Sequence, residues 1–159
     1  MSNENNVFYW LPCAVVFVST AHEDEKDIMT ATAMFVSEKE PLLVISVAKD
    51  HLTERLISQS GKFTLVIAGA AQEKLAIQVG SAKGDDTDKF ERFSISATTL
   101  SGSTALIPEG AAAWMECDVE SSKEINGYQL FMGRVVNQYD SGKPPLVWHK
   151  DGFFGLSKG

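Results

Sequence analysis

The sequence predicts a mainly β protein, a barrel into which two or three short helices are inserted. Its first half has short apolar runs separated by charged segments, at the spacing of antiparallel neighbours. Its last third alternates apolar and polar residues around Asn126-Gly127, a pair that accepts positive φ and favours a hairpin turn. The 159 residues are 44% hydrophobic and 22% charged, with no linker or repeat, which predicts one globular domain over residues 1–159.

Three strands are expected before the first helix. Residues 13–19 form a continuous apolar run that leads into the charged segment 22–27, the pattern of a buried strand followed by a turn. Residues 30–37 are rich in Thr, Phe and Val, and we expect a second strand there. Residues 42–47 form a third, after Pro41, whose missing N–H is tolerated at a strand entrance.

A first helix is expected between Asp50 and Gly61. Asp50 has the side chain of an N-cap, and Gly61 is a typical helix stop. Leu52, Leu56 and Ile57 lie between them at helical spacing and form one apolar face.

Two further short helices are expected after a strand over residues 63–68. The first covers residues 70–79, where apolar residues recur at helical spacing. The second is a helical turn over residues 87–93, capped by Asp86 or Thr87.

The C-terminal third is the clearest β region. Residues 113–120 alternate between an apolar face and an acidic face that we expect to be solvated. Asn126-Gly127 joins this strand to a return strand over residues 128–138. Residues 146–148 and 153–156 are expected to complete the sheet.

The hairpin is expected to contain an irregularity. A simple two-residue turn would pair Val119 with Arg134 and place that charge on the apolar face. We therefore expect a bulge or a longer turn that gives Val119 an apolar neighbour.

Charge and composition limit the partners and the compartment. The net charge of −7 argues against nucleic-acid binding. Cys13 and Cys117 form no CxxC pair and predict two buried, reduced thiols. The polar N-terminus has no signal-peptide pattern and the apolar runs are too short to span a bilayer, so we expect a cytoplasmic protein that does not bind membranes.

The residue spacing offers little support for covalent catalysis or for a metal site. Neither cysteine has a histidine near it in the sequence, and hence there is no support for a cysteine nucleophile. His22, His51 and His149 are isolated, so no metal site is expected. Glycine-rich dinucleotide and Walker motifs are also missing. We assign no catalytic side chain.

Hydroxyl side chains near strand ends favour a phosphorylated cofactor. Thr30 and Thr32, Ser46 and Thr53 surround two predicted strands and a helix start, and amides, hydroxyls and a helix N-terminus together bind phosphate. If Asp50 caps the helix alone, the Thr53 hydroxyl is left for a ligand. The alternative is that these are ordinary strand residues and a helix cap.

Several residues in the middle of the chain can add local positive charge to such a site. They are Lys49, His51, Arg55, Lys83, Lys89 and Arg92. For Lys89-Phe90 the alternative is a surface lysine beside a core phenylalanine, and the aromatic residues Trp148, Phe153 and Phe154 can equally be core.

A set of short segments, in order from about Tyr9 to Leu156, resembles a known family. The segments are Trp10-Leu11-Pro12-Cys13-Ala14-Val15, Ile28-Met29-Thr30-Ala31-Thr32, Pro41-Leu42-Leu43-Val44-Ile45-Ser46-Val47, His51-Leu52-Thr53-Glu54-Arg55-Leu56-Ile57 with Ser60-Gly61-Lys62-Phe63, Asp88-Lys89-Phe90, Phe131-Met132-Gly133-Arg134-Val135, Pro145-Leu146-Val147-Trp148 and Phe153-Phe154-Gly155-Leu156. Together they resemble the flavin reductase-like, FMN-binding split-barrel proteins.

The resemblance implies a Greek-key split β-barrel that forms a homodimer with FMN, or else FAD, at the subunit interface. The implied cofactor contacts are Thr30, Ala31 and Thr32 at the isoalloxazine ring, Ser46, Val47, Ala48 and Lys49 along the ribityl chain, His51 and Thr53 at the phosphate, and Lys89 and Phe90 from a loop. His51 stands where the family often has arginine, so a titratable side chain replaces a permanent positive charge near the phosphate. Ala33 stands where the family often has an aromatic residue, so the resemblance assigns no side chain at this position to stack on the flavin ring.

The implied function is that of a flavoprotein oxidoreductase. Electrons would pass from NADH or NADPH through bound flavin to free flavin or another acceptor, and the protein would supply positioning and electrostatics. One alternative is a flavin-binding electron carrier that NAD(P)H does not reduce. Another is a barrel without cofactor whose acidic face, Glu116, Asp118 and Glu120, binds a basic partner.

Overall fold

The computed structural model describes residues 6–100 and 105–159. In chain order its elements are η2 (Val7–Trp10), β1 (Cys13–Ala14), β2 (Val16–His22), β3 (Glu25–Ala31), β4 (Ala33–Ser37), β5 (Leu42–Ala48), α1 (Leu52–Ser60), β6 (Lys62–Ile67), η3 (Ala70–Gln72), α2 (Glu73–Gly80), α3 (Lys89–Arg92), β7 (Ala97–Thr99), β8 (Leu106–Pro108), β9 (Ala113–Ile125), β10 (Tyr128–Asp140), β11 (Leu146–His149) and β12 (Gly152–Gly155).

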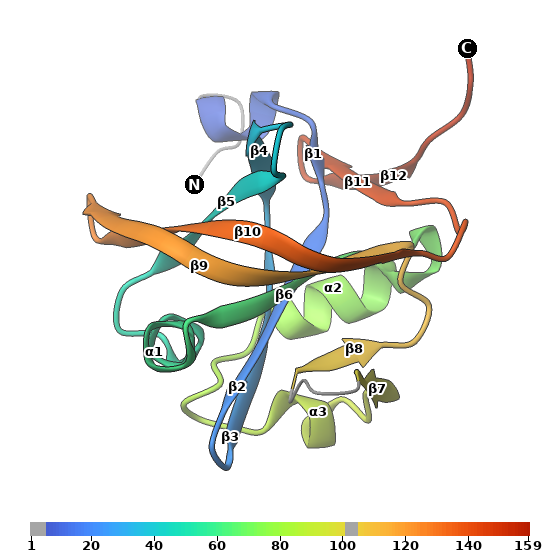
Figure 1. Ribbon diagram of the computed structural model, residues 1–159. Helices are drawn as coiled ribbons and strands as arrows, with labels where there is room; N and C mark the ends of the chain where they lie inside the picture. The colour runs from blue at the N-terminus through green and yellow to red at the C-terminus, as the bar shows by residue number, and fades with distance from the viewer. Residues whose placement is uncertain (1–5, 101–104) are drawn as a thin grey trace.

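A seven-stranded antiparallel sheet in the order β3-β2-β6-β9-β10-β5-β4 dominates the fold. β9 and β10 cross β2 and β3 at a steep angle, so the sheet is strongly curved (Figure 1). Two small sheets, β1-β11-β12 and β7-β8, flank it. The predicted mainly β fold with two or three short helices is confirmed. None of the helices in the described part of the chain is long and apolar enough to cross a membrane.

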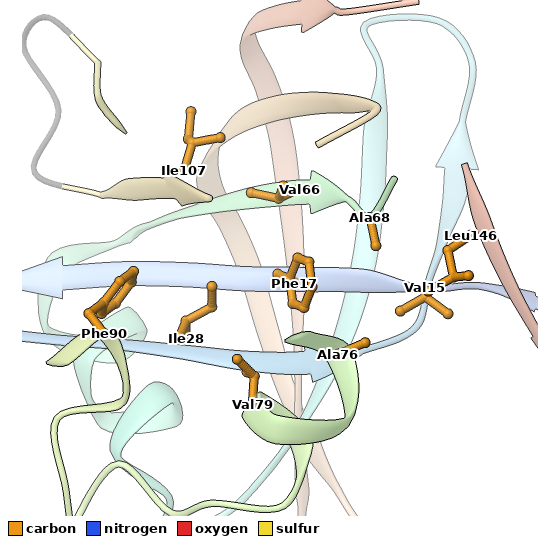
Figure 2. Close-up of a cluster of buried hydrophobic side chains, with 10 residues drawn as sticks. All are labelled: Val15, Phe17, Ile28, Val66, Ala68, Ala76, Val79, Phe90, Ile107 and Leu146. Atoms are coloured by element: carbon orange, nitrogen blue, oxygen red, sulfur yellow. The ribbon is translucent and has the colours of Figure 1, made fainter. Parts of the chain in front are cut away.

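Strand β2 is buried on both faces because the sheet has a core on each side. Phe17 belongs to one cluster, with Ile28, Val66 and Val79 of α2 (Figure 2). Val16 and Val18 belong to a second cluster, which includes Ile57 of α1. A strand covered on both faces needs a continuous apolar run, which is why residues 13–19 lack the alternation of a half-buried strand.

The apolar run 13–19 serves two sheets, because the chain changes partner at Val15. The Val15 N–H donates to the Leu146 carbonyl, and the Val15 carbonyl accepts from the Ala68 N–H, both at 3.0 Å. Before this point β1 pairs with β11, and after it β2 pairs with β6. The expectation that residues 146–148 and 153–156 complete the main sheet is therefore wrong: β11 and β12 form a separate sheet with β1.

The predicted hairpin and its irregularity are both confirmed. Asn126-Gly127 turns with φ values of 51° and 80°. A bulge shifts the register between Met132 and Gly133, so that Val119 pairs with Gly133 and Arg134 pairs with Asp118. Arg134 thereby lies on the polar face.

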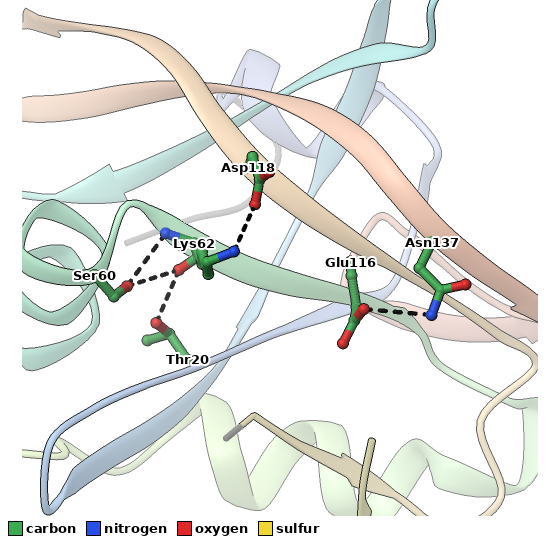
Figure 3. A network of polar contacts seen from close by, with 6 residues as sticks. All are labelled: Thr20, Ser60, Lys62, Glu116, Asp118 and Asn137. Carbon is green, nitrogen blue, oxygen red and sulfur yellow. Dashed lines mark hydrogen bonds and ion pairs between the residues drawn. The ribbon is translucent and has the colours of Figure 1, made fainter. Parts of the chain in front are cut away.

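The acidic face of β9 has partners on neighbouring strands (Figure 3). The contacts are Asp118 Oδ1 with Lys62 Nζ at 3.1 Å, Glu116 Oε2 with Asn137 Nδ2 at 3.4 Å, and Glu120 with Arg134. Asp118 and Glu120 are thus paired with cations of the chain itself, which weakens the argument for a basic binding partner on this face, whereas Glu116 contacts only a neutral amide.

Two predicted helix caps are wrong. Asp50 has φ 68° and precedes the N-cap of α1, which is His51 with extended backbone. An N-cap requires extended backbone, whereas aspartate tolerates the left-handed conformation, so Asp50 forms the turn instead. The cap of α3 is Asp88, not Asp86 or Thr87, and its Oδ1 accepts from the amides of Phe90 and Glu91. Gly61 ends α1 as predicted, with φ 69°.

The two cysteines are free, as expected, but only one is fully buried. Cys117 is buried in the second core cluster, and Cys13 is half-buried near the N-terminal turn. Burial, followed by the charges of Asp118 and Glu116, raises the pKa of Cys117 to about 12. This thiol is a packing residue and not a nucleophile.

Candidate functional site

Two cavities lie beside the end of strand β3, where Met29 and Thr30 line both of them. The larger is open and has a volume of about 600 Å³. Its lining residues are Phe8, Ala14, Val15, Met29, Thr30, Ala31, Thr32, Ser46, Tyr128, Trp148 and Phe153. Most of this lining is apolar or aromatic, which suits a planar ring, and we call this space the ring cavity.

The aromatic wall of the ring cavity is built by segments from both ends of the chain. The Trp148 ring lies 5.6 Å from Phe8 and 5.2 Å from Tyr9, centroid to centroid. The Lys150 N–H donates to the Tyr9 carbonyl at 3.2 Å and so holds η2 beside the β11–β12 turn. Trp148 is tilted by about 45° against both Phe8 and Tyr9, so a planar ligand would contact individual aromatic rings of this wall.

The polar wall of the ring cavity is the break between β3 and β4. Thr32 is exposed between the two strands, and Ala31 pairs with Val16 in the sheet. The Thr30 hydroxyl donates to the Ala76 carbonyl of α2 at 2.7 Å. Thr30 thus anchors the strand to a helix, and Thr32 is left with the freer hydroxyl.

The second cavity is smaller, about 110 Å³, and far more polar. It lies among β3, the start of α1, the end of α2 and the loop that leads to α3. Its lining residues are Asp27, Met29, Thr30, His51, Leu52, Thr53, Val79, Gly80, Ala82, Lys83, Gly84, Asp85 and Lys89. We call it the polar cavity.

A buried cluster of three polar side chains lies against the polar cavity. Thr53 donates to Asp27 Oδ2 at 2.6 Å, and Lys89 Nζ lies 3.4 Å from Asp27 Oδ1. Lys89 also donates to the Ile28 carbonyl at 2.6 Å. The expectation of a free Thr53 hydroxyl is therefore wrong, because a carboxylate on β3 accepts its hydrogen bond. Lys89 is likewise no surface lysine.

The predicted site residues fall into three groups. Thr30, Ala31, Thr32 and Ser46 line the ring cavity, and Thr30, His51, Thr53 and Lys89 line the polar cavity. Val47, Ala48, Lys49 and Phe90 line neither cavity. Val47 and Phe90 are core side chains, and Lys49 Nζ lies 3.7 Å from Glu124 Oε2.

Several lining residues were not among those predicted. Tyr128 and Phe8 reach the ring cavity through strand pairing and the N-terminal turn, and no local motif marks them. For Gly84 the structure shows why a glycine stands at this position: a Cβ there would lie 2.5 Å from Asp27 Oδ1. Its glycine permits the loop to close on that carboxylate, a contact that only the folded chain makes visible.

Comparisons with known proteins agree with this architecture. The flavin reductase like domain family matches residues 8–157. A relative named NADH-dependent flavin reductase from Rhodococcus sp is 30% identical over 148 residues, which cover 89% of this chain and 78% of that protein. The uncharacterized protein YddH of Escherichia coli is 31% identical over 131 residues, covering 79% of this chain and 68% of that protein.

Solved structures share the fold at lower identity. The NADH:FAD oxidoreductase SgcE6 of Streptomyces globisporus superposes with a TM-score of 0.86 at 24% identity, covering 96% of this chain and 90% of that one. An FMN-binding protein from Thermus thermophilus gives 0.84 at 20% identity, covering 98% and 92%. The mainly β fold is that of the flavin reductase barrels, as the sequence predicts, and the chain belongs to the flavin reductase-like domain family.

Proposed function

We propose that this protein is an NADH-dependent flavin reductase that binds FMN across the two cavities. The observation that carries the proposal is that the two cavities lie beside each other: Met29 and Thr30 of β3 line both the ring cavity and the polar cavity at the start of α1. A flavin has the same two parts, a flat ring and a phosphorylated tail. Relatives named as NADH-dependent flavin reductases support the activity and the reductant.

The residues present fit a flavin. A volume of about 600 Å³ is within the range of small-molecule sites, roughly 300–1,000 Å³. Trp148 and Phe153 offer faces to the isoalloxazine ring, and Thr32 and Ser46 offer hydroxyls at its edge. At the far end, the first residues of α1 line the polar cavity, and the N-terminus of a helix attracts phosphate.

The size of the polar cavity favours FMN over FAD. Its volume of about 110 Å³ suits a terminal phosphate, whereas an adenylate group would have to extend outside it. His51, Thr53 and Lys89 are the proposed residues at this end, with Ser46 and the backbone through Lys49 along the tail. Val47 and Phe90 would support the site from the core.

The bound flavin would supply the hydride chemistry, and the chain would supply its placement. Trp148 and Phe153 exclude water from one side of the ring cavity. The Thr30–Ala76 hydrogen bond fixes β3, which lines the cavity as well. We assign no acid or base to a side chain.

We also propose a homodimer that covers the open side of the ring cavity. Exposed apolar side chains lie on η2, which contributes Phe8 to the ring cavity, and on β4, which directly follows the Thr32 break. They are Val7, Phe8, Trp10, Met34, Phe35 and Val36, each at least 50% exposed. Large apolar side chains exposed beside a ligand cavity favour a protein interface.

An absorption spectrum and an anaerobic titration test the function. The purified protein, supplied with FMN, should show a flavin spectrum that bleaches when NADH is added without oxygen. A spectrum that NADH leaves unchanged would instead indicate an electron carrier. If added FMN does not bind at equilibrium, as judged by its absorption and fluorescence, the proposal is contradicted.

A further inference from the structure

The polar cavity contains one buried cation and one buried anion, and they face each other. Lys89 is 5% exposed and Asp27 is 4% exposed, with Nζ and Oδ1 3.4 Å apart. An anionic ligand in this cavity would therefore meet the attraction of Lys89 and the repulsion of Asp27 at nearly the same distance. The buried pair contributes almost no net charge.

Asp27 also engages the donors around it. Thr53 gives its hydroxyl proton to Oδ2 at 2.6 Å, so this hydroxyl cannot donate to a phosphate at the same time. Lys89 divides its donors between Asp27 and the Ile28 carbonyl. Two of the side chains best suited to phosphate are thus bound to the protein itself.

The carboxylate of Asp27 is held in this position. Gly84 lies so close that even a Cβ would overlap the carboxylate, at 2.5 Å from Oδ1. The loop that contains Gly84 closes one side, and Thr53 and Lys89 bind the two oxygens. The other charged residues that line the cavity are Lys83 and Asp85, both exposed, where solvent screens their charges.

We propose that Asp27 is a specificity-determining residue that weakens the hold on the flavin phosphate. Binding then depends mainly on the ring cavity, so the flavin exchanges as a substrate and is not retained as a permanent prosthetic group. Phosphorylated and unphosphorylated flavins should accordingly bind with similar affinity. This inference rests on the proposed function and concerns only the polar end of the same site.

The test compares FMN with riboflavin, which carries the ring and the ribityl chain without phosphate. Dissociation constants are measured by quenching of flavin fluorescence, for the full chain and its variants, at one low salt concentration. In Asp27→Asn the buried Lys89 charge loses its counterion. The preference for FMN over riboflavin should rise about tenfold, and FMN dissociation should slow correspondingly.

Two further variants separate charge from shape. Lys89→Gln leaves the carboxylate without its cation, and the preference for FMN should fall below that of the unmodified protein. The double variant Asp27→Asn with Lys89→Gln is again neutral, and its preference should return to within about twofold of the original. Circular dichroism and melting curves identify the variants that fold. Among these, the preference for FMN over riboflavin should be highest in Asp27→Asn and lowest in Lys89→Gln, and any other order contradicts the proposal.

The outcomes are distinct from those for the proposed function. If neither FMN nor riboflavin binds to the unmodified protein, the flavin assignment itself fails. If riboflavin binds but Asp27→Asn changes both ligands equally, or weakens FMN, the role of Asp27 is refuted while the ring cavity stands. Strong preference for FMN in the unmodified protein would also overturn the inference.

Discussion

The hydroxyl of Thr30 donates a 2.7 Å hydrogen bond to the carbonyl of Ala76, and so ties β3 to α2 at a residue that lines both cavities. Ala76 and Val79 of α2 are buried against β2 and β3. The contact therefore transmits the position of a packed helix to the wall of the proposed flavin site.

Replacing Thr30 with valine should weaken flavin binding and reduce stability slightly. The change keeps the shape but leaves the Ala76 carbonyl without this donor, which costs about 1 kcal/mol. We expect a melting temperature a few degrees lower and a severalfold larger dissociation constant for FMN. Thr30→Ser keeps the hydroxyl and is the control. Equal affinity in both variants would show that the bond does not position the strand.

Replacing Trp148 with alanine should weaken both FMN and riboflavin. Trp148 is half-buried and packs against Phe8 and Tyr9, so its loss removes one face of the ring cavity and loosens η2. Aromatic pairing adds about 0.5–1.5 kcal/mol to the burial term, so a change of roughly tenfold in affinity is expected. Trp148→Phe retains an aromatic face and should lose less. Unchanged riboflavin affinity in Trp148→Ala would place the ring elsewhere.

The comparison of sequence with structure shows where local patterns are sufficient. The Asn126-Gly127 turn and the bulge that spares Val119 follow from backbone preferences and from the cost of burying Arg134, both of which act over short range. Gly61 at the end of α1 follows for the same reason. These predictions need no knowledge of distant segments.

The buried cluster at the site could not be predicted in this way. Thr53 follows its hydrogen-bond partner Asp27 by 26 positions. Lys89 follows Ile28, whose carbonyl accepts its hydrogen bond, by 61 positions. Each has an ordinary local interpretation, as a turn residue, a helix residue and a surface lysine. Only the packing of α1 and α3 on β3 brings them together, and so the predicted free hydroxyl of Thr53 is wrong.

Replacing Gly133 with alanine should destabilise the barrel. A Cβ there would lie 2.5 Å from Phe63 Cζ and 2.9 Å from the Cys117 Cβ, both in the second core cluster. Overpacking of a core costs about 1–3 kcal/mol, and chemical denaturation should show a loss in this range. Gly155→Ala is the matched control, because no atom lies within 4 Å of the added Cβ. Equal stability of the two variants would contradict the packing described.

Stability should fall with pH above the ordinary pKa of a thiol, because of Cys117. Its pKa is raised from 9.0 to about 12, chiefly by burial, so the folded state keeps the proton that the unfolded state releases. Between these values deprotonation favours the unfolded state, by at most about 1.4 kcal/mol per pH unit. Denaturation at pH 8, 9 and 10 measures the slope, and Cys117→Ala should flatten it. An identical slope in the variant would assign the loss to other groups.

Replacing Met34 with lysine should disrupt the proposed homodimer and weaken flavin binding with it. Met34 is 66% exposed on β4, in the strand that follows Thr32, so a charge there enters the proposed interface beside the ring cavity. Ile77→Lys is the matched control: Ile77 is 53% exposed, but it lies on α2, outside the η2 and β4 surface. Light scattering after gel filtration should show a dimer for the original chain and for Ile77→Lys, and a monomer for Met34→Lys. A dimer that survives Met34→Lys would place the interface on another face, whereas a monomer with unchanged FMN affinity would mean that one subunit holds the flavin unaided.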